Sequence, residues 1–212
     1  MAALKDRQRE IAMYGATPYR WTLVSGPQGC GKTHAGLTGL VLKMRMFSGV
    51  DFGVTTKTRK QMKSALRGGI DQIMGEEMAG DDEVAKIPNG HGGYNNLISF
   101  VADNKAAEKR MRSFNLAGML VDEATTLPDG IVAAANARCR VGRNPQLLVL
   151  TNPDGPLHPL KVNYFDCPHD INGKAVWCDI WDNPTMTQAM VDSMSKAYTG
   201  CLLYTSPSPR DS

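Results

Sequence analysis

The sequence predicts an α/β fold with a mostly parallel sheet that is flanked by helices. One observation behind this prediction is that short apolar segments alternate with segments of helical character. The predicted strands span residues 20–25, 51–56, 97–101, 117–121 and 146–150. The predicted helices span residues 34–47, 58–66 and 184–199. A second observation is that the most distinctive motif of the chain falls between the first predicted strand and the first predicted helix.

Three features complete this outline of the elements. The Gly68-Gly69 pair is expected to end the second helix. Residues 75–95 are acidic and rich in Gly and Asn, so they predict an excursion on the surface. The last helix follows Asn183-Pro184 and carries methionines on one face, a pattern typical of core or subunit packing. These methionines are Met186, Met190 and Met194.

A complete phosphate-binding loop, G-x-x-x-x-G-K-[ST], lies between the first strand and the first helix. Its residues are Gly26, Pro27, Gln28, Gly29, Cys30, Gly31, Lys32 and Thr33. The glycines let the backbone curl so that successive N–H groups point at phosphate oxygens. We expect Lys32 to lie between the β- and γ-phosphates and Thr33 to ligate Mg²⁺. Because the N-terminus of the following helix also favours anions, the motif predicts a nucleotide site.

Two adjacent acids, Asp122 and Glu123, follow the predicted strand at residues 117–121. Ligands of open α/β folds bind at the carboxyl edge of the sheet, where these side chains would lie. We expect Asp122 to hold Mg²⁺ opposite Thr33, and Glu123 to act as the general base on the attacking water. A base aimed at water favours a hydrolase over a small-molecule kinase. The sequence therefore predicts a P-loop NTPase of the additional-strand, catalytic-glutamate type.

A polar pair, Thr151 and Asn152, follows the apolar strand at residues 146–150. Their side chains could hydrogen-bond the γ-phosphate or the attacking water. An ordinary strand end before an Asn-Pro turn explains the same residues equally well. Both interpretations stay open at this point.

Several arginines lie close to the acidic pair along the chain. They are Arg110, Arg112, Arg138, Arg140 and Arg143. An arginine supplied to the active site of a neighbouring subunit can stabilise the charge that develops during phosphoryl transfer. Solvated surface charge is the alternative for each of them.

Composition sets few further limits. The 212 residues are 42% hydrophobic and 21% charged, which is ordinary for a globular protein, and the formal charge of +3 identifies no partner. No apolar run approaches the length needed to span a bilayer. The cysteines show no C-x-x-C spacing, so core thiols in a reducing cytoplasm are expected rather than a metal site. They are Cys30, Cys139, Cys167, Cys178 and Cys201.

In their order along the chain, these motifs resemble those of the ATPase domain of the large terminase subunit, the genome-packaging motor of tailed bacteriophages. The resemblance covers residues 4–200. It implies that Leu4 to Glu10 form the family's leading glutamine motif, with Gln8 near the adenine of ATP. Residues 151–158 resemble the family's coupling motif, and Asp182-Asn183-Pro184 resembles its lid region.

The resemblance also selects one arginine. Residues 101–104 and 110–113 resemble the stretch that carries the arginine finger in this family, which makes Arg112 the expected finger. Two positions depart from the pattern, because Ser113 stands where many relatives carry Gly and Pro159 where many carry an aromatic residue.

For function, the resemblance implies an ATP-hydrolysing motor of viral DNA packaging with ATP and Mg²⁺ as cofactors. The partners would be double-stranded DNA, held by its phosphates independently of sequence, the portal protein, the small terminase subunit and further copies of the chain in a ring. The expected location is the host cytoplasm and, transiently, the procapsid portal vertex, but not the mature virion or a membrane. The densest basic run is the candidate for DNA contact, with a solvated helix face as the alternative. It contains Lys57, Arg59, Lys60, Lys63 and Arg67.

We divide the chain into an ATPase core at residues 1–155, a lid and coupling subdomain at 156–200, and a tail at 201–212. The tail, over residues 201–211, resembles a translation of the transposase mosaic-end adapter of sequencing libraries, so it is excluded from the fold. The natural protein is therefore expected to continue beyond Gly200 into the family's nuclease domain, and nuclease activity is not expected from this chain.

Two functional alternatives remain. Another hydrolytic P-loop DNA motor, such as a helicase, would require further helicase motifs and a second motor domain. A truncated fragment that binds nucleotide without turnover is the other alternative, because a finger donated between subunits requires assembly.

Overall fold

The computed structural model describes residues 4–103 and 105–197. Within these ranges the strands form one eight-stranded sheet in the order β3-β4-β5-β2-β6-β7-β1-β8. The strands are β1 Trp21–Ser25, β2 Asp51–Thr56, β3 Ala79–Gly80, β4 Val84–Pro88, β5 Tyr94–Val101, β6 Gly118–Val121, β7 Gln146–Thr151 and β8 Gly173–Trp177. The α-helices are α1 Asp6–Ala12, α2 Lys32–Arg45, α3 Arg59–Gln61, α4 Gly68–Met74, α5 Lys105–Met111, α6 Ile131–Arg138 and α7 Gln188–Ala197.

The centre of the sheet is parallel, as predicted. β7 lies between β1 and β6, with Leu147 opposite both Trp21 and Met119. β7 is therefore inserted between β1, which leads into the phosphate loop, and β6, which the acidic pair follows. This order confirms the additional-strand type of P-loop fold, and it brings the carboxyl ends of all three strands to one edge.

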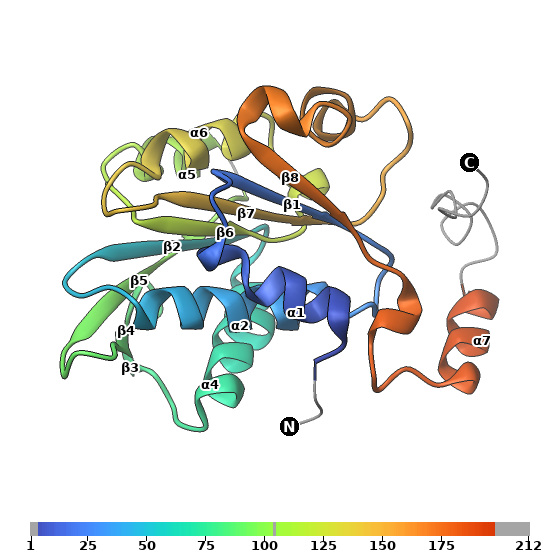
Figure 1. The fold of residues 1–212 in the computed structure, drawn as a ribbon, viewed down its shortest axis with the longest axis horizontal. Helices are drawn as coiled ribbons and strands as arrows, with labels where there is room; N and C mark the ends of the chain where they lie inside the picture. Colours follow the sequence, from blue (N-terminus) through green and yellow to red (C-terminus); the bar gives the residue numbers. More distant parts are fainter. Residues whose placement is uncertain (1–3, 104, 198–212) are drawn as a thin grey trace.

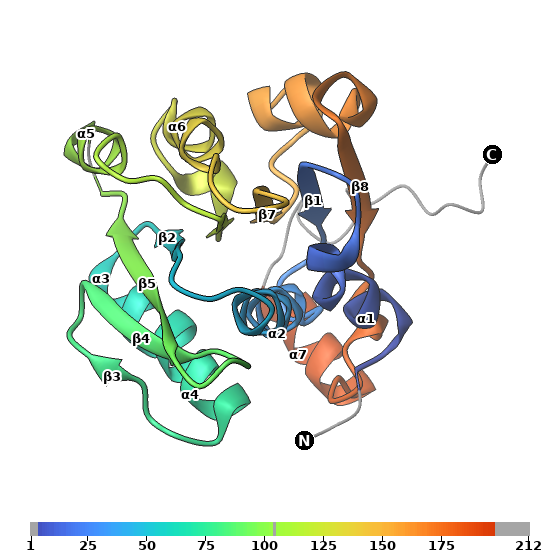
Figure 2. The ribbon, with the colours of Figure 1, turned by 60° about the vertical axis from the view of Figure 1, so that its left-hand side comes forward.

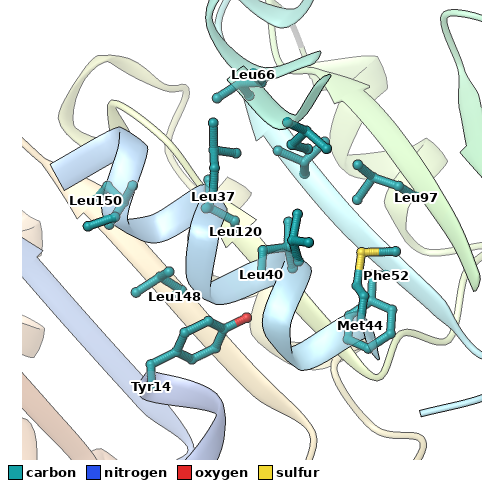
Figure 3. Close-up of a cluster of buried hydrophobic side chains, with 14 of the residues drawn as sticks. Tyr14, Leu37, Leu40, Met44, Phe52, Leu66, Leu97, Leu120, Leu148 and Leu150 are labelled. Carbon is teal, nitrogen blue, oxygen red and sulfur yellow. The ribbon is translucent and has the colours of Figure 1, made fainter. Parts of the chain in front are cut away.

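Helices cover both faces of the sheet (Figures 1 and 2). α1, α2 and α4 lie on one face, and α5 and α6 lie on the other. Side chains of β7 alternate between the two cores: Leu148 and Leu150 pack toward α2 (Figure 3), whereas Leu147 and Val149 join the core under α5 and α6. A strand buried on both faces reads as a continuous apolar run, which explains why the central strands were predictable.

The prediction for residues 58–95 was wrong in two respects. The helix does not end at Gly68-Gly69, because a π-helical segment, Met62–Arg67, leads directly into α4, which ends where Gly75 adopts a φ of 78°. The segment at 75–95 is also not a simple excursion, because it contains β3 and β4. β4 pairs antiparallel with β5 and buries Ala85 and Ile87. The dense Gly, Asn and acidic residues around β4 conceal its short alternating pattern.

Other elements were not predicted from the sequence. α5 and α6 were missed, and β8 pairs in parallel with β1, so the main sheet continues past the boundary that we placed at residue 155. α7 begins at Gln188, later than expected. Residues 198–200 and the tail at 201–212 lie outside the described residues. Among the helices of the described ranges, none combines the length and apolar character needed to cross a membrane.

Candidate functional site

The phosphate loop connects β1 to α2 at the carboxyl edge of the sheet. Gly29 and Gly31 both adopt the left-handed conformation, with φ values of 85° and 86°. Residues with a Cβ rarely take this conformation, so the glycines are what allow the loop to curl. Lys32 is the first residue of α2, which runs to Arg45, so the positive end of the helix dipole faces the inside of the loop.

Lys32 joins the phosphate loop to the end of β7. Its side chain is buried, and its Nζ donates to Pro27 O at 3.2 Å and to Asn152 Oδ1 at 2.5 Å. Asn152, one of the polar pair after β7, therefore faces the ammonium group. The two residues are 120 positions apart in sequence, and only the insertion of β7 beside β1 brings them together.

Thr33 and Asp122 meet at the same edge. Thr33 Oγ1 donates to Asp122 Oδ1 at 3.3 Å, and Asp122 is only 5% exposed. Burial raises the pKa of the Asp122 carboxyl to about 6, and the charge of Glu123 adds to this rise while Lys32 opposes it. A hydroxyl and a carboxylate at this spacing are hard oxygen donors of the kind that Mg²⁺ prefers, so the donor set fits that ion.

Glu123 is held in an unusual backbone conformation, with φ 51° and ψ 42°. A non-glycine residue in this region stores strain, and such residues often occur at functional sites. Thr126 stabilises this backbone conformation, because its N–H and Oγ1 both donate to Glu123 O, at 2.8 and 2.9 Å. The carboxylate itself accepts a hydrogen bond of 2.5 Å from Gln61 Nε2.

Gln61 was missed in the sequence, where it appeared only as part of a basic helix. Thr58 Oγ1 accepts from Gln61 N at 3.2 Å, and Thr58 N donates to Gln61 Oε1 at 3.1 Å. This reciprocal pair is a capping box, and the T-x-x-Q spacing is the signal that could have located the start of α3. The cap leaves the amide nitrogen of Gln61 free to point at the end of β6.

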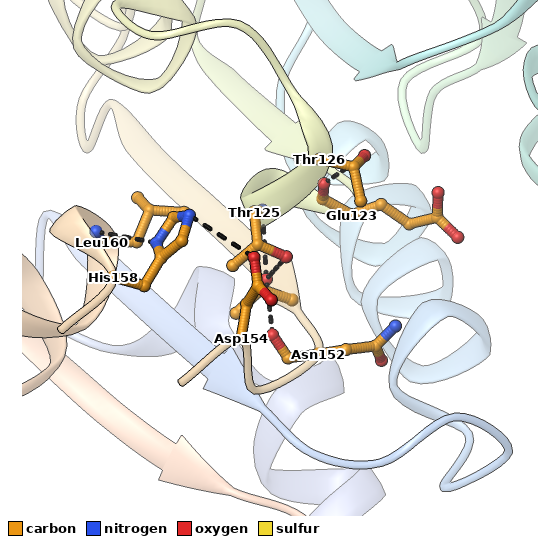
Figure 4. A network of polar contacts seen from close by, with 8 residues as sticks. Glu123, Thr125, Thr126, Asn152, Asp154, His158 and Leu160 are labelled. Atoms are coloured by element: carbon orange, nitrogen blue, oxygen red, sulfur yellow. Dashed lines mark hydrogen bonds and ion pairs between the residues drawn. The ribbon is translucent and has the colours of Figure 1, made fainter. Parts of the chain in front are cut away.

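Thr151 contacts the segment after the acidic pair. Its Oγ1 donates to Thr125 Oγ1 at 2.9 Å and accepts from Thr125 N at 3.2 Å (Figure 4). Thr151 and Asn152 therefore differ in their contacts, because Thr151 faces the β6 loop and Asn152 faces Lys32. Farther along the segment after β7, His158 Nε2 lies 3.8 Å from Asp154 Oδ2.

Gln8 lies against Gly31 of the phosphate loop. Its side chain is 2% exposed, and a Cβ added at Gly31 would lie 2.2 Å from Gln8 Nε2. α1 packs along α2, which places Gln8 there. The structure thus brings Gln8, the loop, Asp122, Glu123 and Asn152 to one region.

Arg112 is not part of this group in the described chain. Its side chain is 68% exposed and pairs with Glu108 on the same helical segment, with Nη2 and Oε1 2.6 Å apart. Arg110 instead pairs with Glu83 at 3.3 Å, and Arg138 donates to the carbonyl of Arg112 at 3.0 Å. The expected finger therefore projects from the surface, on the α5 side of the sheet.

No family model matches the chain, and none of the curated proteins matches it. Solved structures do. The large terminase of the thermophilic bacteriophage D6E superposes with a TM-score of 0.85 and 22% identity, over 95% of this chain and 52% of that one. The complex of that terminase with ATP-gamma-S superposes with a TM-score of 0.83 and 22% identity, over 95% of this chain and 51% of that one. The large terminase ATPase domain of Thermus phage P74-26 superposes with a TM-score of 0.60 and 11% identity, over 92% of this chain and 94% of that one.

The chain thus spans about half the length of the D6E protein and nearly all of the P74-26 ATPase domain. At these identities the likeness establishes the fold. The resemblance that the motifs indicated is confirmed at that level, and so is the predicted α/β P-loop NTPase class.

Proposed function

We propose that this chain is the ATP-hydrolysing motor region of a viral DNA-packaging terminase large subunit. The observation that carries the proposal is the convergence of three strand ends. The loop after β1, the acids after β6 and Asn152 after β7 are linked there by the Lys32–Asn152 and Thr33–Asp122 hydrogen bonds. The fold that builds this edge is the one that the D6E and P74-26 large terminases share.

In this proposal each residue has one task. The curled loop and Lys32 bind and orient the phosphates of ATP, while Thr33 and Asp122 hold Mg²⁺. The ion, when bound, supplies positive charge that offsets the charge on the phosphate oxygens. Glu123 accepts the proton of the attacking water, and Asn152, whose Oδ1 accepts from Lys32 Nζ, senses the γ-phosphate. Gln8 supports the loop on the side assigned to adenine.

DNA contact is assigned to the exposed part of the basic run. Lys63 forms an ion pair of 2.6 Å with Asp82, and Arg67 donates to the carbonyl of Asp81, so both are engaged within the chain. Lys57, Arg59 and Lys60 are exposed and remain the better candidates for phosphate contacts. The same proposal includes the portal protein and the small terminase subunit as partners. It also includes assembly of the chain into a ring and a location at the procapsid portal vertex.

A second candidate, nucleotide binding with slow turnover, is favoured by one observation. Arg112 lies on the surface and pairs with Glu108, so its guanidinium would reach a reaction centre in a neighbouring copy. If the finger acts between subunits, the isolated chain binds ATP but hydrolyses it slowly.

The test is nucleotide binding by the Lys32→Ala variant, followed with a fluorescent ADP analogue. We expect affinity to fall at least about tenfold, because the variant loses a charge-assisted contact to phosphate. Lys161→Ala is the matched control, since Lys161 is a partly exposed lysine that pairs with Asp166 away from the loop. Equal affinity in the two variants would contradict the assignment of the loop.

A further inference from the structure

The segment after β8, residues 178–194, packs against the phosphate loop at Gly29. Asn183 Nδ2 donates to Gly29 O at 2.7 Å. The orientation of the amide follows from its other end, because Asn183 Oδ1 accepts from Thr185 N at 3.0 Å and from Thr185 Oγ1 at 2.9 Å. Asn183 therefore presents its nitrogen to the loop and cannot be turned over without losing three hydrogen bonds.

Two methionines of the same segment contact the loop at the same glycine. A Cβ added at Gly29 would lie 2.9 Å from Met186 Cε and 3.5 Å from Met194 Cε. The segment is also attached to the start of α1, because Lys5 Nζ donates to Trp181 O at 2.6 Å. Met186 and Met194 thus pack against the loop at Gly29, whereas Met190, the third methionine of the predicted pattern, is 51% exposed.

The hydrogen bond from Asn183 determines which way one peptide group of the loop faces. A peptide group is planar, with its C=O and N–H on opposite sides. When Gly29 O points to Asn183, the N–H of Cys30 points to the opposite side, where its acceptor is Pro27 O at 3.4 Å, the carbonyl that also accepts from Lys32 Nζ. That distance is long for a hydrogen bond, so the N–H can be given up to a phosphate oxygen at little cost.

We propose that Asn183 is a positioning residue that presets the Gly29 peptide for phosphate binding, and that it transmits occupancy of the loop to α7. Any change of the Gly29 peptide on nucleotide binding alters the contacts of Asn183, Met186 and Met194 at once. The residues that respond to occupancy of the loop are 186–194, which comprise the two residues before α7 and the first part of that helix. This inference rests on the proposed nucleotide-binding function and names a residue that acts through the loop, not on the substrate.

The test combines nucleotide affinity with hydrogen–deuterium exchange. Asn183→Ala removes the donor, and we expect the dissociation constant of ADP to rise about threefold to tenfold, as for loss of one hydrogen bond. Turnover at saturating ATP should stay within about twofold, since the reacting groups are untouched. In the parent chain, ADP should change the exchange protection of residues 186–194, and in Asn183→Ala at saturating ADP this change should be lost.

Two further variants separate positioning from plain stability. Asn183→Gln keeps an amide donor and should recover part of the affinity, whereas Thr185→Ala leaves the Asn183–Gly29 bond and should bind ADP as the parent does. If Asn183→Ala does not fold, Met186→Ala takes its place in the exchange experiment, with the same expected loss of coupling.

The results have distinct meanings. Unchanged ADP affinity and unchanged exchange response in Asn183→Ala, or a fall in thermal stability alone, overturns the positioning role and leaves the proposed function standing. Failure of the parent chain itself to bind ADP overturns the proposed function, and the inference with it.

Discussion

Gln61 Nε2 donates a hydrogen bond of 2.5 Å to Glu123 Oε2, which joins the helix after β2 to the acidic end of β6. The residue is itself held by the capping box with Thr58. The amide therefore holds one oxygen of the proposed base on the β2 side of the site. It belongs to the same segment as the exposed residues Lys57, Arg59 and Lys60, so a contact of those side chains with DNA would act close to Glu123.

Replacing Gln61 with alanine should raise basal ATP turnover about threefold to tenfold, because the freed carboxylate can turn toward the attacking water. The KM for ATP should stay constant, since the loop is unchanged. Steady-state kinetics of Gln61→Ala against Gln72→Ala, an exposed glutamine on α4, provide the measurement. A fall in turnover would mean that the hydrogen bond positions the base instead of restraining it.

Glu123→Gln should bind ATP with parent affinity but hydrolyse it about 10²- to 10⁴-fold more slowly, since the amide cannot accept the proton. Binding is measured with a fluorescent nucleotide and hydrolysis by phosphate release. Glu77→Gln, at an exposed position, is the control. Hydrolysis at the parent rate would remove Glu123 as the general base.

Arg112→Ala should leave nucleotide affinity unchanged and reduce turnover in the assembled state. Mixing Arg112→Ala chains with Glu123→Gln chains should restore part of the activity, because some interfaces then pair an intact base with an intact finger. Arg110→Ala is the comparison, since that guanidinium pairs with Glu83. Absence of rescue at every mixing ratio would argue against a finger donated between copies.

Lys43 predicts a pH dependence of stability. The side chain is fully buried, with its Nζ donating to Asn144 O at 2.7 Å and to Gln146 Oε1, and lying over the rings of Tyr14 and Phe47. Burial lowers the pKa of Lys43 from 10.5 to about 8. Between these two values the unfolded chain binds the proton and the folded chain does not, so the contribution of Lys43 to stability rises with pH there.

The measurement is urea unfolding of the parent and Lys43→Met from pH 7 to pH 10. The free energy of unfolding of the parent should rise relative to the variant above about pH 8, by at most about 1.4 kcal/mol per pH unit. Other buried groups titrate in both chains, so the difference reports Lys43 together with its charge interaction with the Cys139 thiol. Parallel stability curves would show that the ammonium is not desolvated in solution.

Much of the fold could be predicted because its signals are local. The phosphate loop, β2 and the acidic end of β6 are contiguous strings whose residue types are demanded by a curled backbone, a buried strand and a charged edge. α5 and α6 were missed, and so was β8, because their short patterns do not differ enough from those of loops. The end of the second helix was wrong because the surrounding packing maintains helix at Gly68 despite its low intrinsic propensity.

The sequence by itself determined the motifs of the proposed site: a nucleotide-type loop, a Thr and Asp that meet as a pair of oxygen donors, and an adjacent glutamate. Only the tertiary structure decided which residues support them. Gln61 meets Glu123 across 62 positions, and Asn183 meets Gly29 across 154. Both contacts follow from strand order, which places β2 beside β6 and β8 beside β1. Strand order arises from burial of both faces of the sheet as a whole, so no local pattern along the chain encodes it.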